Sequence, residues 1–457
     1  MDKKNGKATI AVAVITAFVT TFTGSALNMS IPAIGAEFDV GAGYVGWLVT
    51  GYTLTVAALS VPFGRIADVT CRRAILIYGI AAFSVCCGIA VFSSSMTMLL
   101  AVRIAQGAGA AMIFSTNTAV LISVFPDDAR GRVLGYSIAA TYAGLSAGPV
   151  IGGLLNYNFG WRSTFVITGI LSALSLLAAI KGLPREKYES LRRPPDIAGN
   201  ILYMLFIVLL MYGLSEIGTG PVPAAAAALG SVLAVVFVLH EAKVRDPAVD
   251  VNIFKEIPGY TCMNIAAMIN YGATFAVSYL MSIYLQVISG YTSQMAGVIM
   301  IVQPLMIAGL SPLAGRMSDR LSPHIMSSVG MALCGAGAVI LAFAGADTAL
   351  AIIVTALAVT GLGSALFSSP NTNAVMASVD REDYGVASSV LATMRSIGNT
   401  LSMAVVTAAA TALMSDATLM EASHEDMIIM MRISFSIFSL FCAAGIFFSI
   451  KGKKACS

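Results

Sequence analysis

The chain alternates long apolar stretches with short polar turns. A window of about twenty residues, the length of helix that crosses the hydrocarbon core of a bilayer, picks out fourteen such stretches. The predicted spans are residues 8 to 34, 44 to 63, 74 to 94, 96 to 124, 133 to 157, 161 to 182, 197 to 217, 221 to 240, 258 to 288, 292 to 315, 323 to 344, 348 to 377, 385 to 413 and 427 to 450. The pattern therefore predicts an all-α membrane protein with fourteen transmembrane helices.

Composition supports this class. The chain has 457 residues, of which 58% are hydrophobic and 11% charged, and its mean hydropathy is +0.86. So much apolar surface cannot be buried in one soluble core, so the lipid bilayer is a partner. The net charge of +3 is small and indicates no nucleic-acid partner.

Basic residues gather on one side of the predicted topology. An even number of spans places both termini on the same side, and that side receives all but four of the 26 Lys and Arg residues. The exceptions are Arg103, Arg162, Arg395 and Arg432. By the positive-inside rule we expect a multi-pass protein of the cell membrane with both termini in the cytoplasm.

Two short motifs occur twice. Residues 64 to 68 read Gly-Arg-Ile-Ala-Asp, and residues 315 to 319 read Gly-Arg-Met-Ser-Asp. A fainter pair contains Gly131 and Gly385, which are separated by nearly the same offset. Repeats of this kind are typical of secondary transporters whose substrate site lies between two halves. We predict six-helix bundles over residues 1 to 183 and 258 to 457, with two inserted helices and their flanking loops over 184 to 257.

The fifth predicted span carries glycines at every fourth position. Gly144, Gly148 and Gly152 share one helix face and permit close approach of another helix, and Pro149 removes a backbone hydrogen bond. This pattern indicates either a gate between helix bundles or ordinary glycine-mediated helix packing.

Three segments resemble signatures of one family. Residues 64 to 73 resemble the loop signature of the major facilitator superfamily, residues 100 to 109 its fourth-helix signature, and residues 144 to 153 its fifth-helix antiporter signature. Residues 161 to 165 and the fourteen spans resemble the drug and proton antiporter subfamily, a group of multidrug efflux transporters with two extra central helices. The resemblance covers the whole chain. It implies the major facilitator fold and export of small amphipathic compounds by alternating access, with proton antiport.

Charged residues in turns and polar residues within the predicted spans are the candidate functional residues. Asp68 and Arg72, with Asp319 and Arg320 in the repeat, are expected to form a conformational latch, or else to be solvated loop charges. Arg103 is costly inside a span, and Gln106 lies on its face. The residues expected along a substrate path are Thr23, Asn28, Arg103, Gln106, Asn117, Asn270, Tyr271, Gln303, Asn371, Asn373, Arg395 and Asn399. Any single Asn here is also explained by a hydrogen bond between helices.

The first span departs from the subfamily. Its usual Asp is Thr23 here, while Asn28 and Pro32 align. Proton coupling needs a titratable group, and the candidates that remain are Asp68 and Glu216. The coupling site is therefore left unknown.

Other classes are disfavoured. The chain lacks the phosphate-binding loop of an ATP-driven pump, and His240, His324 and His424 stand alone without metal-ligand spacing. We expect no enzyme activity, no cofactor and no metal, and a monomer. The alternatives are a facilitator without proton coupling, an exporter of one specific metabolite or lipid, and a membrane sensor on the same fold.

Overall fold

The computed structural model describes residues 3 to 125, 127 to 184, 196 to 216, 220 to 244, 247, 253 to 318, 321 to 379, 384 to 414 and 423 to 456. This part of the chain is helical and contains no strand. Its elements are α1 (Lys3–Asn28), α2 (Ile31–Phe38), α3 (Ala42–Val69), α4 (Arg72–Val91), α5 (Met96–Val124), α6 (Asp127–Phe159), α7 (Arg162–Gly182), α8 (Ile197–Ser215), α9 (Pro221–Glu241), α10 (Ile253–Glu256), α11 (Pro258–Ile283), η1 (Tyr284–Ile288), α12 (Ser293–Met300), α13 (Val302–Ser318), α14 (Pro323–Ala342), α15 (Leu350–Ala377), α16 (Tyr384–Met414) and α17 (His424–Cys456).

The all-α membrane fold is confirmed, with thirteen helical segments in the described residues long and apolar enough to cross a membrane. The predicted span 133 to 157 lies in α6 and is not among the thirteen. α6 is 33 residues long, but glycines and small polar residues lower its hydropathy. It packs on α1 and on α12, so much of its surface meets protein and has less need of long apolar side chains.

Two predicted spans are each divided into two helices. The first ends at Asn28, and α2 begins with Pro32 in its first turn, where a missing N–H costs nothing. The predicted span 292 to 315 is broken at Ile301 between α12 and α13. Pro304 cannot donate to the carbonyl of Met300, which explains the break.

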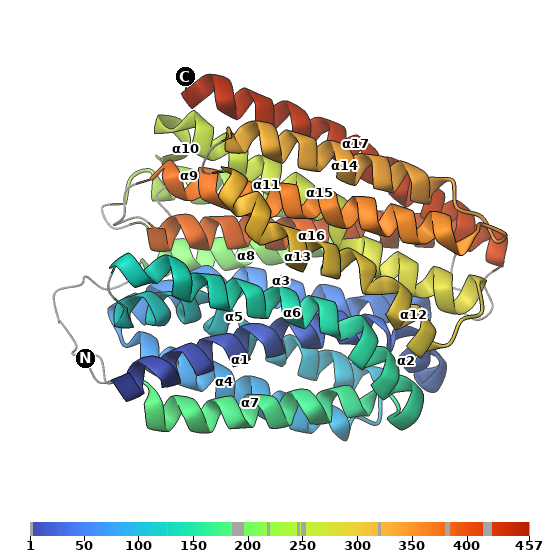
Figure 1. Ribbon diagram of the computed structural model, residues 1–457, viewed down its shortest axis with the longest axis horizontal. Helices are drawn as coiled ribbons and strands as arrows, with labels where there is room; N and C mark the ends of the chain where they lie inside the picture. Colours follow the sequence, from blue (N-terminus) through green and yellow to red (C-terminus); the bar gives the residue numbers. More distant parts are fainter. Residues whose placement is uncertain are drawn as a thin grey trace.

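The helices form two groups (Figure 1). In the N-terminal bundle, α1 to α7, helix α1 packs on α6 and α7, and α5 packs on α3 and α4. In the C-terminal bundle, α11 to α17, helix α14 packs on α15 and α17, and α11 packs on α16 and α17. α1 begins and α17 ends at the same end of the molecule (Figure 1). We call this end the terminus side and the other the far side.

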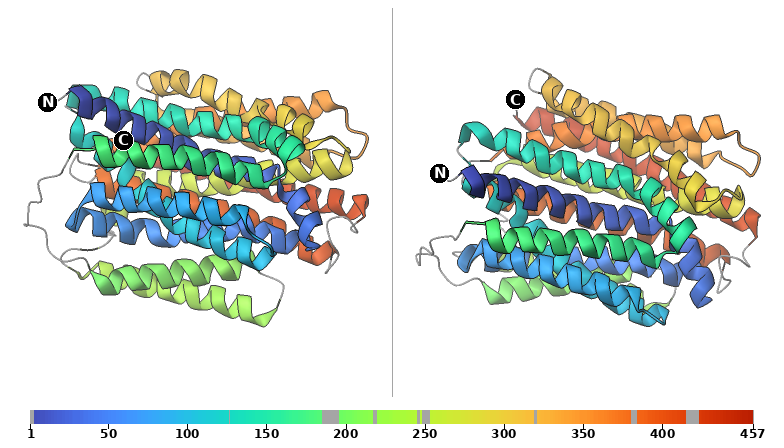
Figure 2. Two further views of the ribbon diagram at one scale, coloured as in Figure 1. Left: turned by 90° about the horizontal axis from the view of Figure 1, so that it is seen from below. Right: turned by 60° about the horizontal axis from the view of Figure 1, so that its bottom comes forward.

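The central pair, α8 and α9, lies at one edge of the molecule (Figure 2). α8 packs on α9, on α3 of the N-terminal bundle and on α16 of the C-terminal bundle. Of the inserted helices, α8 therefore contacts both bundles, and α9 packs on α8.

The largest buried apolar cluster joins the two bundles on the far side. It contains Leu27 and Val45 from the N-terminal bundle together with Leu280 and Met403 from the C-terminal bundle, all nearly inaccessible to solvent. Burial of apolar side chains excludes water from this region, so the far side is closed between the bundles.

Candidate functional site

Arg103 lies wholly inside the N-terminal bundle. Its side chain is 1% exposed. Its Nε donates to the carbonyl of Leu48 on α3 (3.2 Å), and its Nη1 donates to Oε1 of Gln106 (2.5 Å). The guanidinium carbon lies 4.3 Å from the centre of the Tyr52 ring, a cation–π distance. All of these partners of the guanidinium belong to α3 and α5 of its own bundle, and Arg103 therefore links these two helices.

Other polar residues predicted along the path also join helices of the N-terminal bundle. Gln106 donates to Sγ of Cys87 on α4 (3.0 Å), and Asn117 donates to the carbonyl of Ala13 on α1 (3.2 Å). Thr23 is fully buried and donates to the carbonyl of Val19 in its own helix (2.7 Å). These contacts match the alternative of hydrogen bonds within and between helices.

The second buried arginine has a different environment. Arg395 on α16 lies with its guanidinium carbon 4.9 Å from the centre of the Tyr271 ring on α11. It also interacts electrostatically with Tyr142, which lies on α6 in the N-terminal bundle. All three side chains are partly exposed. This group, the Tyr142–Tyr271–Arg395 cluster, therefore lies between the two bundles, and Tyr142 was not predicted from the sequence.

Several residues of the predicted path carry buried polar atoms without partners. Nε of Arg395 and Oδ1 of Asn399, one turn away on α16, have no hydrogen-bond partner among the described residues. The same holds for Oδ1 of Asn371 on α15 and of Asn28 on α1. Buried polar atoms are almost always satisfied, so this set is suited to a ligand or to water.

The remaining predicted path residues lie in the C-terminal bundle. Asn270 is buried, with its amide 3.9 Å from Sγ of Cys334. Gln303 is buried at the contact of α13 with α15. Asn373 is exposed toward the terminus side and donates to the hydroxyl of Ser318 (3.1 Å).

The glycine motif of α6 faces α1. A Cβ on Gly144 would lie 2.4 Å from Oγ1 of Thr21, and a Cβ on Gly152 would lie 2.7 Å from Cα of Ala26. Gly148 meets Ser25 in the same way. The three glycines thus share one face, and that face packs within the N-terminal bundle.

The opposite side of the same segment meets the C-terminal bundle. A Cβ on Gly297 of α12 would lie 2.1 Å from the carbonyl oxygen of Pro149, and a Cβ on Gly153 would lie 2.4 Å from the carbonyl oxygen of Ser293. The Ser293 hydroxyl donates to the carbonyl of Gly153 (3.3 Å). This backbone contact between bundles, the α6–α12 contact, includes Pro149 of the predicted set. Gly153, Ser293 and Gly297 were missed, because only the tertiary structure shows which helix meets which.

A second contact between bundles lies at the far-side ends of α1 and α11. The Ser282 hydroxyl donates to the carbonyl of Asn28 at 2.7 Å. Together with the α6–α12 contact it joins the bundles on the side already closed by apolar packing.

The central pair is attached to both bundles. The hydroxyl of Tyr203 on α8 donates to the carbonyl of Ala57 on α3 (3.1 Å) and lies 3.0 Å from the hydroxyl of Thr393 on α16. At the far-side end, Nε1 of Trp47 on α3 donates to the carboxylate of Glu216. The proton-coupling candidate Glu216 is therefore engaged with the N-terminal bundle.

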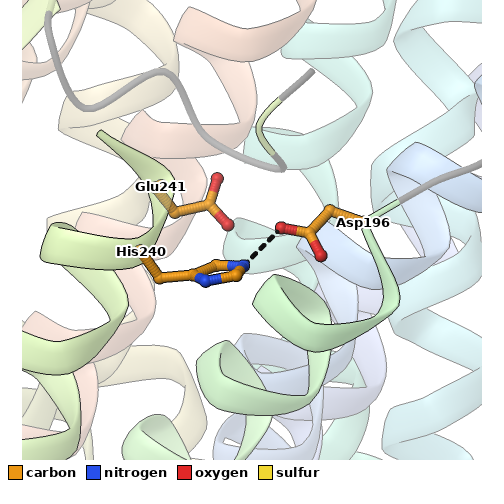
Figure 3. A group of neighbouring side chains, drawn as sticks. All are labelled: Asp196, His240 and Glu241. Carbon is orange, nitrogen blue, oxygen red and sulfur yellow. Dashed lines mark hydrogen bonds and ion pairs between the residues drawn. The ribbon is translucent and has the colours of Figure 1, made fainter. Parts of the chain in front are cut away.

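His240 does not stand alone, contrary to the prediction. Its Nε2 lies 2.8 Å from Oδ2 of Asp196, the N-cap residue of α8, and the buried Glu241 lies beside them (Figure 3). Their ligand atoms are within 4.8 Å of one another, so the group has the composition of a cation site. Burial disfavours the charged form of Asp196, but hydrogen bonds from the Gly199 N–H and His240 outweigh it and lower the pKa of Asp196. We interpret the contact between His240 and Asp196 as a hydrogen bond that joins the ends of α8 and α9.

The predicted latch falls largely outside the described residues. Asp319, Arg320 and the side chain of Asp68 are not among them, and Arg72 is partly buried at the start of α4. The latch therefore stays a prediction.

The segment that resembles the subfamily at residues 161 to 165 has a structural role. Nε1 of Trp161 donates to Glu37 (2.7 Å), and Arg162 forms an ion pair with the same carboxylate (2.7 Å). The hydrogen bond from Arg162 lowers the pKa of Glu37, and that from Trp161 adds to the effect, against a smaller opposing effect of burial. The motif thus fixes α7 to α2 on the far side.

Comparisons with known proteins agree with this arrangement. The model of the Major Facilitator Superfamily matches residues 13 to 403 and, in a second match, 263 to 451. The riboflavin transporter RibZ of Clostridioides difficile is 29% identical over 387 residues, which is 85% of this chain and 84% of that protein. The multidrug resistance protein Stp of Mycobacterium tuberculosis is 29% identical over 391 residues, 83% of this chain and 71% of that protein.

A solved structure shows the same fold. A bacterial homologue of the human lysosomal transporter Spinster, described as inward-facing and unoccupied, superposes with a TM-score of 0.72 at 15% identity and covers 100% of this chain and 98% of that one. At this level of identity the similarity concerns the fold alone.

Proposed function

The chain belongs to the Major Facilitator Superfamily, and from this premise we propose that it is a secondary active exporter of small amphipathic compounds. It works by alternating access, with the two bundles as the moving bodies and proton antiport as the energy source. The observation that carries the proposal is the Tyr142–Tyr271–Arg395 cluster. It places partly exposed polar and aromatic side chains of both bundles together, halfway along α6 and α11.

The contacts on the far side support a state closed to the outside. The α6–α12 contact and the Ser282 to Asn28 hydrogen bond join the bundles there. For a substrate to leave on the far side, these contacts must break, and two-state rearrangements of such packed interfaces are the usual form of transporter gating. The bundle contacts on the far side therefore act as the outer gate.

A second candidate is a carrier of one specific metabolite. The relative RibZ is named as a riboflavin transporter, whereas Stp is named as a multidrug resistance protein. Polyspecific sites use adaptable apolar side chains, while specific sites use fixed hydrogen bonds. A substrate panel distinguishes the two functions.

Counterflow in liposomes is the test. Purified protein is reconstituted, liposomes are loaded with one unlabelled compound, and entry of its labelled form is followed for a panel of riboflavin, a neutral aromatic dye, a lipophilic cation and an aromatic carboxylate. A multidrug exporter exchanges several members of the panel, and a specific carrier exchanges one. Exchange of none by well-folded protein would contradict the transport proposal and favour a sensor.

The orientation is proposed from the distribution of basic residues, with the terminus side in the cytoplasm. Asp347 is exposed on the far side and Lys243 on the terminus side. In a background without the native cysteines, we expect Asp347→Cys to react with an impermeant maleimide added outside intact cells, and Lys243→Cys to react only after permeabilisation. The reverse pattern would show that the orientation is inverted.

A further inference from the structure

The two arginines inside the helical bundles differ in how their charge is balanced. A guanidinium in the bilayer interior costs at least a few kcal/mol unless it is paired. Arg103 donates to Leu48 and Gln106 and stacks on Tyr52, all in its own bundle. Arg395 has an unpartnered Nε; the guanidinium is hydrogen-bonded to Tyr271, and it interacts electrostatically with the phenol groups of Tyr271 and Tyr142.

A phenol balances a cation only weakly, because it is neutral at physiological pH. The structure therefore shows a positive charge between the bundles that retains hydrogen-bonding capacity. Its planar fork matches the two oxygens of a carboxylate, and such charge-assisted pairs are about twice as strong as neutral hydrogen bonds.

Arg395 and Arg103 also differ in exposure. Arg395, Tyr271 and Tyr142 are each partly exposed, whereas Arg103 is 1% exposed. Tyr142 on α6 interacts electrostatically with Arg395 on α16, so the group has members from both bundles. A compound bound here would contact both bundles, as alternating access requires.

The surroundings select for aromatic compounds. The ring of Tyr271 supplies a flat apolar face beside the cation. The unpartnered amide oxygen of Asn399, one turn from Arg395 on α16, adds an acceptor for a polar substituent of a ligand. A lipophilic cation would instead meet a like charge while it loses its hydration.

We propose that the Tyr142–Tyr271–Arg395 cluster binds the acidic group of an aromatic monoanion, with Arg395 pairing with a carboxylate and the tyrosine rings contacting the ring system. The protein thereby prefers weakly acidic aromatic substrates to cations. This inference rests on the proposed transport function and specifies the substrate class of the same site.

The test compares two probes of nearly equal shape. 1-Naphthylacetate carries the carboxylate, and 1-naphthylacetamide is its neutral isostere. We expect wild-type protein in liposomes to exchange the carboxylate with a half-saturating concentration about tenfold lower than that of the amide, since a charge-assisted hydrogen bond is stronger than a neutral one.

Variants locate the effect. Arg395→Gln should raise the half-saturating concentration of the carboxylate to that of the amide, because the glutamine keeps hydrogen-bonding capacity without charge. Arg395→Lys should retain part of the preference. Arg432→Gln is the matched control, since it removes the same charge from an exposed position on α17, and it should behave like wild type.

The outcomes separate this inference from the proposed function. Exchange of both probes with equal half-saturation by wild-type protein would overturn the inference and leave transport intact. A preference that survives in Arg395→Gln would also overturn it. If Arg395→Gln does not insert into the membrane, the half-saturating concentrations of the two probes on wild-type protein alone decide whether the inference holds. Failure of folded wild-type protein to exchange any compound of the larger panel would instead contradict the transport function.

Discussion

Replacing Arg103 by alanine is expected to abolish transport and to lower the thermal stability of the purified protein. The change removes hydrogen bonds to Leu48 and Gln106 and the contact with the Tyr52 ring at a side chain that is 1% exposed. Acceptors left unsatisfied in a buried position cost about 1 to 3 kcal/mol each. Because Arg103 joins α5 to α3, and α3 packs on α16 of the other bundle, the loss loosens a helix at the interface between bundles.

Counterflow and thermal unfolding of detergent-solubilised protein measure the two effects. Arg103→Lys keeps the charge without the planar fork and should recover stability only in part. Arg432→Gln serves again as the control for loss of a positive charge. Full transport by Arg103→Ala would show that the group has no part in the moving structure.

Replacing Gly297 by alanine is expected to favour the state open to the outside and to reduce transport at least about tenfold. The added Cβ would lie 2.1 Å from the carbonyl oxygen of Pro149, and both are held by helical backbone. Neither atom can move without shifting a helix, so the α6–α12 contact cannot form as it stands. A penalty of a few kcal/mol on one state is enough to displace a two-state equilibrium by about a hundredfold.

Labelling from outside reports the shift directly. Cα of Val150 lies 3.4 Å from the position of the Gly297 Cβ, and its side chain is partly exposed, so a cysteine at Val150 lies at the edge of the contact and gains exposure when the contact opens. We expect its labelling rate to rise in Gly297→Ala. Gly309→Ala is the matched control on α13, where a Cβ meets nothing within 4 Å. Equal labelling rates in the two variants would argue against a gate at α6–α12.

The helices were largely predictable because membrane helices have a required length and composition. α5 has the predicted bounds of residues 96 and 124. The breaks at Pro32 and Pro304 were missed, because hydropathy averages over a window and does not register one missing N–H.

The sequence predicted which residue types belong to the candidate site, but it did not predict which residues contact one another. Arg103 and Arg395 look alike in the sequence, yet one is balanced within its bundle and the other lies between bundles. Tyr142 was missed because tyrosine is common in spans and nothing in its neighbourhood along the chain marks it. The pairing of His240 with Asp196, 44 residues apart, depends on how α8 packs on α9.

The partner helix of the glycine motif also depends on the tertiary structure. The four-residue spacing of Gly144, Gly148 and Gly152 correctly indicates a shared, closely packed face, but spacing does not say which helix packs there. That face meets α1, while the contact with the other bundle uses Pro149 and Gly153.

Active accumulation in liposomes tests the proposed function most directly. Protein is reconstituted with the terminus side facing outward, a compound identified by counterflow is supplied outside, and the interior is made about one pH unit more acidic. Proton antiport predicts accumulation inside to about tenfold above the outside concentration for one proton per neutral molecule, with collapse to equal concentrations when an ionophore dissipates the gradient. Equal concentrations inside and outside, reached at the same rate with and without the pH gradient, would contradict proton-driven export.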